Sequence, residues 1–134
     1  MGLLPVKSNK EKCNPMSIVN IEQKLSLFSD HWSPKIVGEL NGQHVKLAKL
    51  KGPFVWHKHE EEDELFFVLK GKLTMEFRDK TLVIHPNEFL IVPKGVDHRP
   101  VADEEVSVML FEPATTLNTG DQENNLTRHT LERL

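Results

Sequence analysis

Three things that this sequence lacks limit what the protein can be. It has a single cysteine, Cys13, so it can form neither an intramolecular disulfide nor a metal site built from several thiolates. Its longest apolar runs, such as Leu65–Leu69 and Phe89–Val92, fall far short of the roughly 20 residues that span a bilayer. It has no excess of positive charge either, because the formal net charge is -3. We therefore expect a cytoplasmic protein that binds neither nucleic acid nor membranes.

What the sequence does contain is typical of one folded globular domain. The chain has 134 residues, of which 38% are hydrophobic and 28% are charged. This length suits a single domain with a modest core. The start of the chain carries several charged residues and lacks the apolar centre of a secretory signal. We predict a disordered leader over residues 1–15 and one domain over residues 16–134.

A helical pattern occurs once, just after the leader. Ile21, Leu25 and Phe28 recur at the spacing of one helix face, and Asn20 is a typical N-cap residue. Later segments do not sustain this period over three turns. The sequence therefore predicts one short helix over residues 20–28.

Short strands separated by turn residues fill the chain from residue 36 to 112. The clearest hairpin signal is Asn41-Gly42, which suits a type I′ turn because both positions accept a positive φ. A polar stretch at Ala102–Glu105 predicts another turn, and the tail after residue 112 is predicted to be irregular. The predicted strands are 36–40, 44–50, 53–59, 64–69, 73–77, 81–85, 89–93, 98–101 and 106–112. Evenly spaced strands of this kind predict an all-β sandwich or small antiparallel barrel.

Four residues in this β region have the side chains and spacing of a metal site. His57 and His59 project from the same face if they lie on a strand. Glu64 begins the next predicted strand after an acidic turn, and a hairpin return brings its carboxylate beside the two rings. His98 follows a tight turn that can direct it to the same place. Three imidazoles and one carboxylate suit one divalent ion per chain, with Fe, Mn, Ni, Co, Zn and Cu all possible.

The remaining histidines have no such pattern and are predicted to be surface or capping residues: His31, His44, His85 and His129.

The same four residues carry a resemblance to the cupins. Their first motif, Gly, a spacer, His-x-His, Glu and Gly, resembles Gly52, His57, His59, Glu64 and Gly71. The resemblance covers residues 36–112. It implies a cupin-like antiparallel jelly-roll barrel with a short N-terminal helix and an irregular C-terminal tail. It also implies that the four residues are metal ligands.

The second cupin motif is matched with two substitutions. Pro93, Gly95 and His98 occupy its Pro-x-Gly and His positions. Asn87 replaces its first Gly, and Ala102 replaces its last Asn; the spacer before His57 in the first motif is also one residue short. Asn accepts the left-handed backbone that Gly adopts, and Ala102 is not a ligand position. The predicted metal site is therefore retained.

Three further stretches resemble small stand-alone cupins of the mannose-6-phosphate-isomerase-like group. They are 97–100, 111–113 and 118–121. The label implies a similar barrel rather than sugar-phosphate chemistry, because a fold does not determine a function. Small cupins pair through an edge strand, so the resemblance also implies a homodimer.

The surroundings of the site are less determined by the sequence. Strand parity from Glu64 places Phe66 and Val68 on the ligand face, with Met75 across the hairpin, and we predict these as walls of a substrate pocket. Glu112, at the end of a predicted strand, is either an acid or base or a structural residue next to Pro113.

Two classes of function fit these features. The first is a metal-dependent enzyme, an oxygenase or an isomerase, acting on a small molecule. The second is a non-catalytic barrel in which the metal anchors a small ligand for binding or sensing. A purely structural barrel is the third reading, and metal analysis distinguishes it from the other two.

Overall fold

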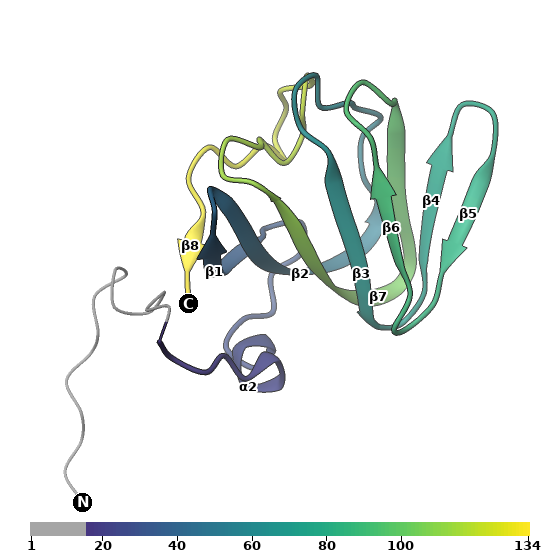
Figure 1. Cartoon of the computed structure of the whole chain (residues 1–134). Coiled ribbons are helices and arrows are strands. Elements are labelled where there is room, and N and C mark those ends of the chain that lie inside the picture. The colour runs from purple at the N-terminus through teal and green to yellow at the C-terminus, as the bar shows by residue number, and fades with distance from the viewer. Residues whose placement is uncertain (1–15) are drawn as a thin grey trace, which may run out of the picture.

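The computed structural model describes residues 16–134, so the predicted leader and Cys13 lie outside the described residues. Residues 16–134 form one short helix and eight strands, which are drawn in Figure 1. The helix is α2 (Ile21–Leu25). The strands are β1 (Lys35–Leu40), β2 (Gln43–Pro53), β3 (Glu64–Lys70), β4 (Leu73–Phe77), β5 (Thr81–Ile84), β6 (Phe89–Val92), β7 (His98–Pro113) and β8 (Glu132–Arg133). The predicted all-β fold with one short helix is confirmed.

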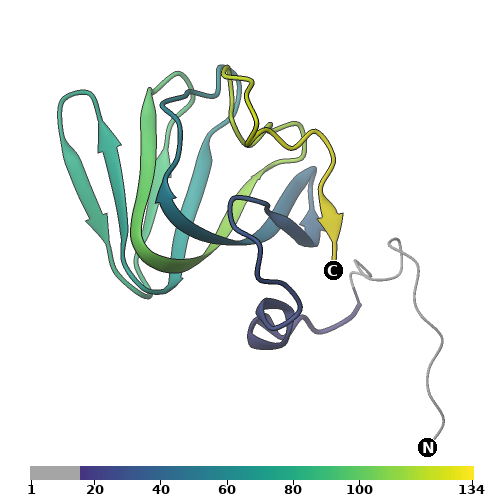
Figure 2. The same ribbon diagram turned by 180° about the vertical axis from the view of Figure 1, so that it is seen from behind.

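The strands form one sheet that curls around a central core without closing. Its order is β5-β4-β7-β2-β1-β8, and β3 pairs with β7 and with β6. Every pairing is antiparallel except that of β1 with β8, so the sheet is mixed. Figures 1 and 2 show β4 and β5 projecting at one side and β8 at the other. This arrangement is an open version of the predicted antiparallel barrel.

β7 is the strand that joins the two halves of the molecule. On one side it pairs with β2 along most of its length. On the other side its first part pairs with β4 and its second part with β3. The predicted turn at Ala102–Glu105 is wrong, because β7 continues through it. Ala102 pairs with Gly52 and Val106 pairs with Leu50, so three residues of β7 bulge opposite one residue of β2. The bulge exposes the acidic side chains without ending the strand.

The predicted strand 53–59 is also wrong. β2 already ends at Pro53, and the segment after it makes only an isolated bridge between His57 and His98. Phe54 donates one further backbone hydrogen bond, to the carbonyl of Pro100 at 2.9 Å. Too few backbone bonds are formed for a ladder, so the His-x-His segment is a loop held against the start of β7.

Two local predictions from turn and cap chemistry hold, with changed limits. The Asn20 side chain accepts a hydrogen bond from the Gln23 backbone at 2.9 Å, as expected of an N-cap, but the helix ends at Leu25 rather than at residue 28. Asn41 and Gly42 both have positive φ, +50° and +77°. Asn87, at a motif position where Gly is usual, has φ +69° and adopts the left-handed conformation expected of it.

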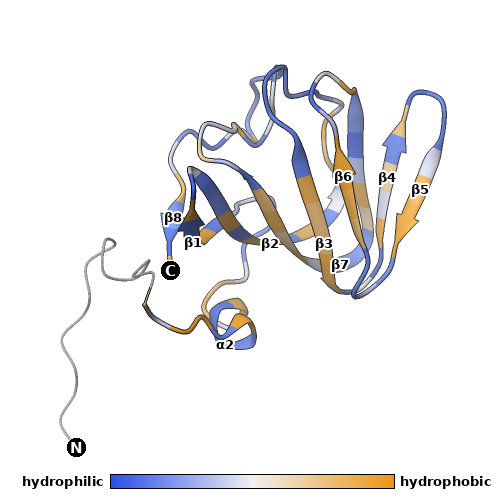
Figure 3. Cartoon of the chain, viewed as in Figure 1, coloured by the Kyte–Doolittle hydropathy of each residue, from blue (hydrophilic) through white to orange (hydrophobic). Residues whose placement is uncertain are grey.

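The sheet has a core on each face. Alternation in β2 turns Ala48 and Leu50 toward the larger core inside the curled sheet, and Leu47 toward a smaller core under α2. Figure 3 shows the corresponding apolar segments along β2, β3 and β6. No helix in residues 16–134 is long and apolar enough to cross a membrane.

Candidate metal centre

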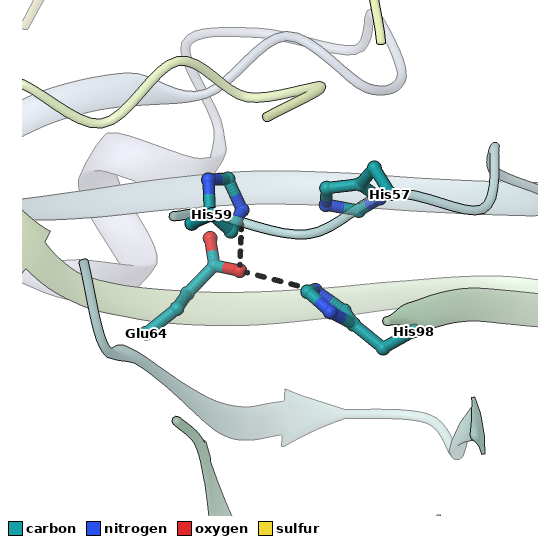
Figure 4. Close-up of side chains that lie close together, drawn as sticks. All are labelled: His57, His59, Glu64 and His98. Atoms are coloured by element: carbon teal, nitrogen blue, oxygen red, sulfur yellow. Dashed lines mark ion pairs between the residues drawn. The ribbon is translucent and has the colours of Figure 1, made fainter. Parts of the chain in front are cut away.

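The structure brings the four predicted ligand residues together inside the curled sheet. One ligand atom from each of His57, His59, Glu64 and His98 lies within 4.8 Å of the others. All four residues are buried, and none is more than 4% exposed. Figure 4 shows the Glu64 carboxylate between the imidazoles of His59 and His98, with His57 beside them. These residues are therefore positioned to bind a metal ion.

The backbone and the nearby carbonyls orient two of the imidazoles. His57 and His98 exchange backbone hydrogen bonds of 3.0 and 2.9 Å, which hold the loop against the start of β7. The Nδ1 of His57 lies 2.9 Å from the Val55 carbonyl, and that of His98 lies 2.8 Å from the Val96 carbonyl. A carbonyl acceptor requires the proton on Nδ1, so in both rings Nε2 is the atom with a free lone pair.

Distances around Glu64 fit a shared ion. Its Oε1 lies 3.4 Å from the Nε2 of His59 and 3.6 Å from the Nε2 of His98. Two atoms bound to one ion at about 2.1 Å are about 3.0 Å apart at a right angle and about 3.4 Å apart at the tetrahedral angle. These two observed separations are close to the expected values.

The hydrogen bonding of the cluster points the same way. Within the described residues, His59 Nδ1 and Nε2, Glu64 Oε1 and His98 Nε2 are buried and have no hydrogen-bond partner. Buried polar atoms without partners are costly and uncommon in folded proteins. Coordination of a cation satisfies Oε1 and one nitrogen of each imidazole at once, so the donor set fits a divalent metal.

The electrostatics of His57 and Glu64 favour the protonation states that metal binding needs, whereas those of His59 favour the protonated ring. Burial, with the neighbouring His98, lowers the pKa of His57 to about 4 and keeps its ring neutral. Burial acts in the same sense on His59, but the Glu64 carboxylate outweighs it and raises the pKa of His59. Burial opposes the charge of Glu64 as well, but the neighbouring polar groups of Glu112, His59 and His98 outweigh it and hold the pKa of Glu64 well below the usual range. A neutral His57 and an anionic Glu64 are the ligand forms of these residues.

A buried ion pair, Lys46–Glu112, lies beside the cluster. Glu112 was a candidate from the sequence, whereas Lys46 was not. Glu112 of β7 accepts a hydrogen bond of 2.7 Å from Lys46 Nζ, and both residues are 2% exposed or less. Burial and the adjacent Glu64 carboxylate raise the pKa of Glu112 well above its usual value. Side chains alternate between the two faces of a strand, and this alternation places Lys46 on the inward face of β2 with Ala48 and Leu50. It was the signal that could have identified Lys46.

The C-terminal tail holds the His-x-His loop from outside. Asp121 accepts a hydrogen bond from the Lys58 backbone and donates one to the Lys58 carbonyl, both of 3.0 Å. Gly120 has a positive φ of +57°, and a Cβ there would collide with the Lys58 carbonyl oxygen. The tail therefore fixes the residue between His57 and His59.

A cavity of about 30 Å³ opens beside the ligands. Its walls are mainly apolar, and His57, Glu64 and Glu112 are the ionisable residues that line it. Of the predicted pocket residues, Phe66 lines this cavity, whereas Val68 and Met75 are fully buried in the larger core and do not line it. The other lining residues include Trp32, Phe54, Pro100, Leu110 and Asn118.

The remaining histidines lie apart from the cluster. His31, His85 and His129 are at least partly exposed, and each lies near a glutamate. The prediction is wrong for His44, which is 7% exposed. It lies on the same inward face of β2 as Lys46, and this strand parity buries it.

Comparisons with known proteins agree with the fold and the motifs. The family model described as a cupin domain (Cupin_2) matches residues 43–112. The chain is 44% identical to a cupin-2 domain containing protein from Shewanella frigidimarina. That crystal structure superposes with a TM-score of 0.71, over 72% of this chain and 94% of the other. Protein NMB1881 from Neisseria meningitidis is 31% identical, with a TM-score of 0.68 over 73% of this chain and 100% of the other. The uncharacterised protein YdbB of Bacillus subtilis is 40% identical over 88 residues, which are 64% of this chain and 72% of YdbB. The chain therefore belongs to the cupin family.

Proposed function

We propose that this cupin binds one divalent metal ion through His57, His59, Glu64 and His98, and is an enzyme that acts on a small molecule beside it. The observation that carries the proposal is the convergence of four buried ligand atoms within 4.8 Å, several of them without a protein partner among the described residues. Fe, Mn, Ni, Co, Zn and Cu all suit this set of three imidazoles and one carboxylate. Such an ion, when bound, supplies a Lewis acid or a centre that activates oxygen.

Glu112 is the residue we propose for proton transfer. It lines the cavity together with Glu64 and His57, so its carboxyl group is within the space that a substrate would enter. Its raised pKa favours the protonated form, which is the form that a general acid needs. Oε2 has no partner in the described part of the chain, while Oε1 is held by Lys46. In this proposal Oε2 holds the proton and Lys46 fixes the orientation of the carboxyl group.

The reaction class stays a choice between an oxygenase and an isomerase. The apolar walls exclude water, which both classes require, and a proton-transferring Glu112 favours the isomerase. The resemblance to mannose-6-phosphate-isomerase-like cupins stays a prediction and supports the barrel more than a sugar-phosphate substrate. The alternative, a non-catalytic barrel that anchors a ligand on the metal, would use the same four residues and the same cavity.

Turnover by the metal-loaded protein tests this function. The metal-loaded chain is incubated with a panel of small hydroxy acids, keto acids and sugars, and oxygen uptake and substrate isomerisation are followed. We expect substrate-dependent turnover that Glu112→Gln lowers by about 100-fold or more, the usual contribution of a general acid or base. Glu104→Gln, the same change at an exposed residue in the bulge of β7, is the matched control. Binding of a panel member without turnover would instead support the ligand-anchoring alternative.

We also propose a homodimer, as the family resemblance implies. Within residues 16–134, β6 pairs only with β3 and leaves one edge free, and its outward residues Phe89 and Ile91 are 59% and 52% exposed. Light scattering of the chain should give twice the monomer mass, and Phe89→Lys with Ile91→Lys should restore the monomer. Leu82→Lys on β5 is the control for adding charge to an exposed apolar strand position. A monomeric unmodified chain would contradict the proposal.

A further inference from the structure

A second cavity lies on the other side of the Lys46–Glu112 pair from the metal ligands. It has a volume of about 180 Å³ and is bounded by the inner face of β1 and β2 and by the C-terminal tail. Figures 1 and 2 show this tail, the yellow segment, running over the end of the curled sheet to β8 beside β1. Lys46 belongs to both regions, because it lines this cavity and pairs with Glu112 of the first one.

The buried polar groups around this cavity include two that can donate hydrogen bonds, the Lys46 ammonium and the Thr116 hydroxyl. Lys46 carries three N–H donors, and within the described residues its ammonium bonds only to Glu112. The Thr116 hydroxyl and His44 Nδ1 are buried and have no hydrogen-bond partner in residues 16–134. Thr116 and His44 are each 7% exposed. Three buried side chains that line this cavity thus have polar atoms whose hydrogen-bonding capacity is not fully used.

The charges around the cavity are of one sign. Arg128 lines it, and its guanidinium donates only to the carbonyls of Asn125 and Thr127, at 3.1 and 3.2 Å; it has no carboxylate partner in the described part of the chain. None of the residues that line the cavity is acidic. The nearest carboxylates are already engaged: Glu112 with Lys46, Glu39 with Arg133 and near His44, and Glu123 with His129.

We propose that this cavity binds a small organic anion, a carboxylate or a phosphate monoester with a short hydrocarbon part. The oxygen atoms of such an anion accept hydrogen bonds from Lys46, Thr116 and Arg128, which form charge-assisted bonds to an oxyanion. Ile36, Leu117 and Leu131 form the apolar part of the lining and contact the hydrocarbon part. The inference does not rest on the metal site or on the proposed enzymatic function.

Titration of the full chain with defined probes tests the proposal. Butyrate and inorganic phosphate are added separately, with butylammonium as a probe of the same hydrocarbon part and opposite charge, and backbone amide spectra are recorded. We expect butyrate, phosphate or both to shift the signals of residues 114–117 and 128–131 with one saturable site. We expect butylammonium to leave these signals unchanged.

Two variants separate a specific site from general attraction. Arg128→Gln should weaken binding about tenfold, the equivalent of one charge-assisted hydrogen bond. Thr116→Val, which removes one uncharged donor, should weaken it by a smaller factor. Arg78→Gln, the same change at an exposed arginine paired with Asp97 outside the cavity, should bind as the unmodified chain does. Spectra outside the cavity show whether each variant is folded.

Two results would overturn the inference. One is that neither anion saturates at roughly 10 mM, which would show a cavity filled by water alone. The other is that the Arg128 and Thr116 variants bind the anions as tightly as the unmodified chain. The same titration on His57→Ala distinguishes this site from the metal centre, because anion binding should persist when metal binding is lost.

Discussion

The two sides of the Lys46–Glu112 pair differ in what they offer a ligand. On the side of β3, His57, His59 and His98 with Glu64 present imidazole lone pairs and a carboxylate oxygen, which suit a cation. On the side of β1, Lys46 and the residues around the second cavity present donors and positive charge, which suit an anion. Both regions lie inside one curled sheet, and a single ion pair of 2.7 Å separates them.

This difference follows from which strands supply the inward side chains. β2 contributes Lys46, and the next inward residues of this strand, Ala48 and Leu50, are apolar. β3 contributes Glu64, which is its first residue. β7 lies between these two strands and contributes Glu112, whose carboxyl group meets both. Removing one partner of a buried pair such as Lys46–Glu112 is costly, because the other polar group is left buried without compensation. Variants of the Lys46–Glu112 pair should therefore disturb both regions most strongly.

Removing the lysine should have the largest effect. Lys46→Ala leaves the Glu112 carboxyl group buried without its hydrogen-bond partner and opens a cavity where the lysine side chain was packed, and we expect a loss of about 3–5 kcal/mol in the free energy of unfolding. Urea denaturation of the metal-free protein measures this loss. Lys46→Met combined with Glu112→Leu removes both partners and should recover most of it. A single variant as stable as the unmodified chain would show that the pair does not hold the two regions together.

Disturbing the tail should have the next largest effect, and it should be confined to the metal side. Gly120→Ala places a Cβ against the Lys58 carbonyl at a positive φ, so we expect a loss of about 3 kcal/mol together with weaker metal binding. Denaturation and metal titration measure the two effects. Gly42→Ala, also at a positive φ but with open space around it, is the control and should leave metal binding unchanged. Unchanged metal binding in Gly120→Ala would contradict the role assigned to the tail.

The pH dependence of the metal-free protein should be smaller. The pKa of His57 in the folded chain is lowered to about 4, so between pH 4 and about 6.5 the unfolded chain binds the proton that the folded chain does not. Stability is therefore fully present above about pH 6.5 and falls as the pH falls, by about 2 kcal/mol between pH 7 and pH 5 for this group. His59, whose pKa is raised, acts in the opposite sense and offsets part of the loss.

Denaturation at the two pH values, with and without His57→Gln, isolates this contribution. The variant cannot take up the proton, so its stability should fall less between pH 7 and pH 5 than that of the unmodified chain. An equal fall in both proteins would show that His57 is not the group responsible.

The features that the sequence predicted correctly are mostly those that depend on neighbouring residues. The Asn20 cap, the Asn41-Gly42 hairpin and the left-handed Asn87 are set by neighbouring residues, and all three are present in the structure. The four ligand residues were identified by type, order and spacing, although the strand expected to carry His57 and His59 is a loop fixed by pairing with His98.

The features that were missed depend on distant contacts. Ala102–Glu105 has the composition of a turn, but pairing with β2 carries it through as a bulge. The Lys46–Glu112 pair and the tail contact at Lys58 join residues 66 and 63 positions apart, and no local pattern indicates which residues will meet. Parity along β2 was the one available signal for Lys46 and His44.

Elemental analysis of the purified, untagged chain tests the central claim most directly. The account predicts about one equivalent of a divalent transition metal per chain, lost in His57→Ala and in His98→Ala but retained in His85→Ala, an exposed histidine outside the cluster. Metal-free protein that takes up no divalent ion when Fe, Mn, Ni, Co, Zn or Cu is added, or a metal content that the His57 and His98 variants leave unchanged, would contradict it.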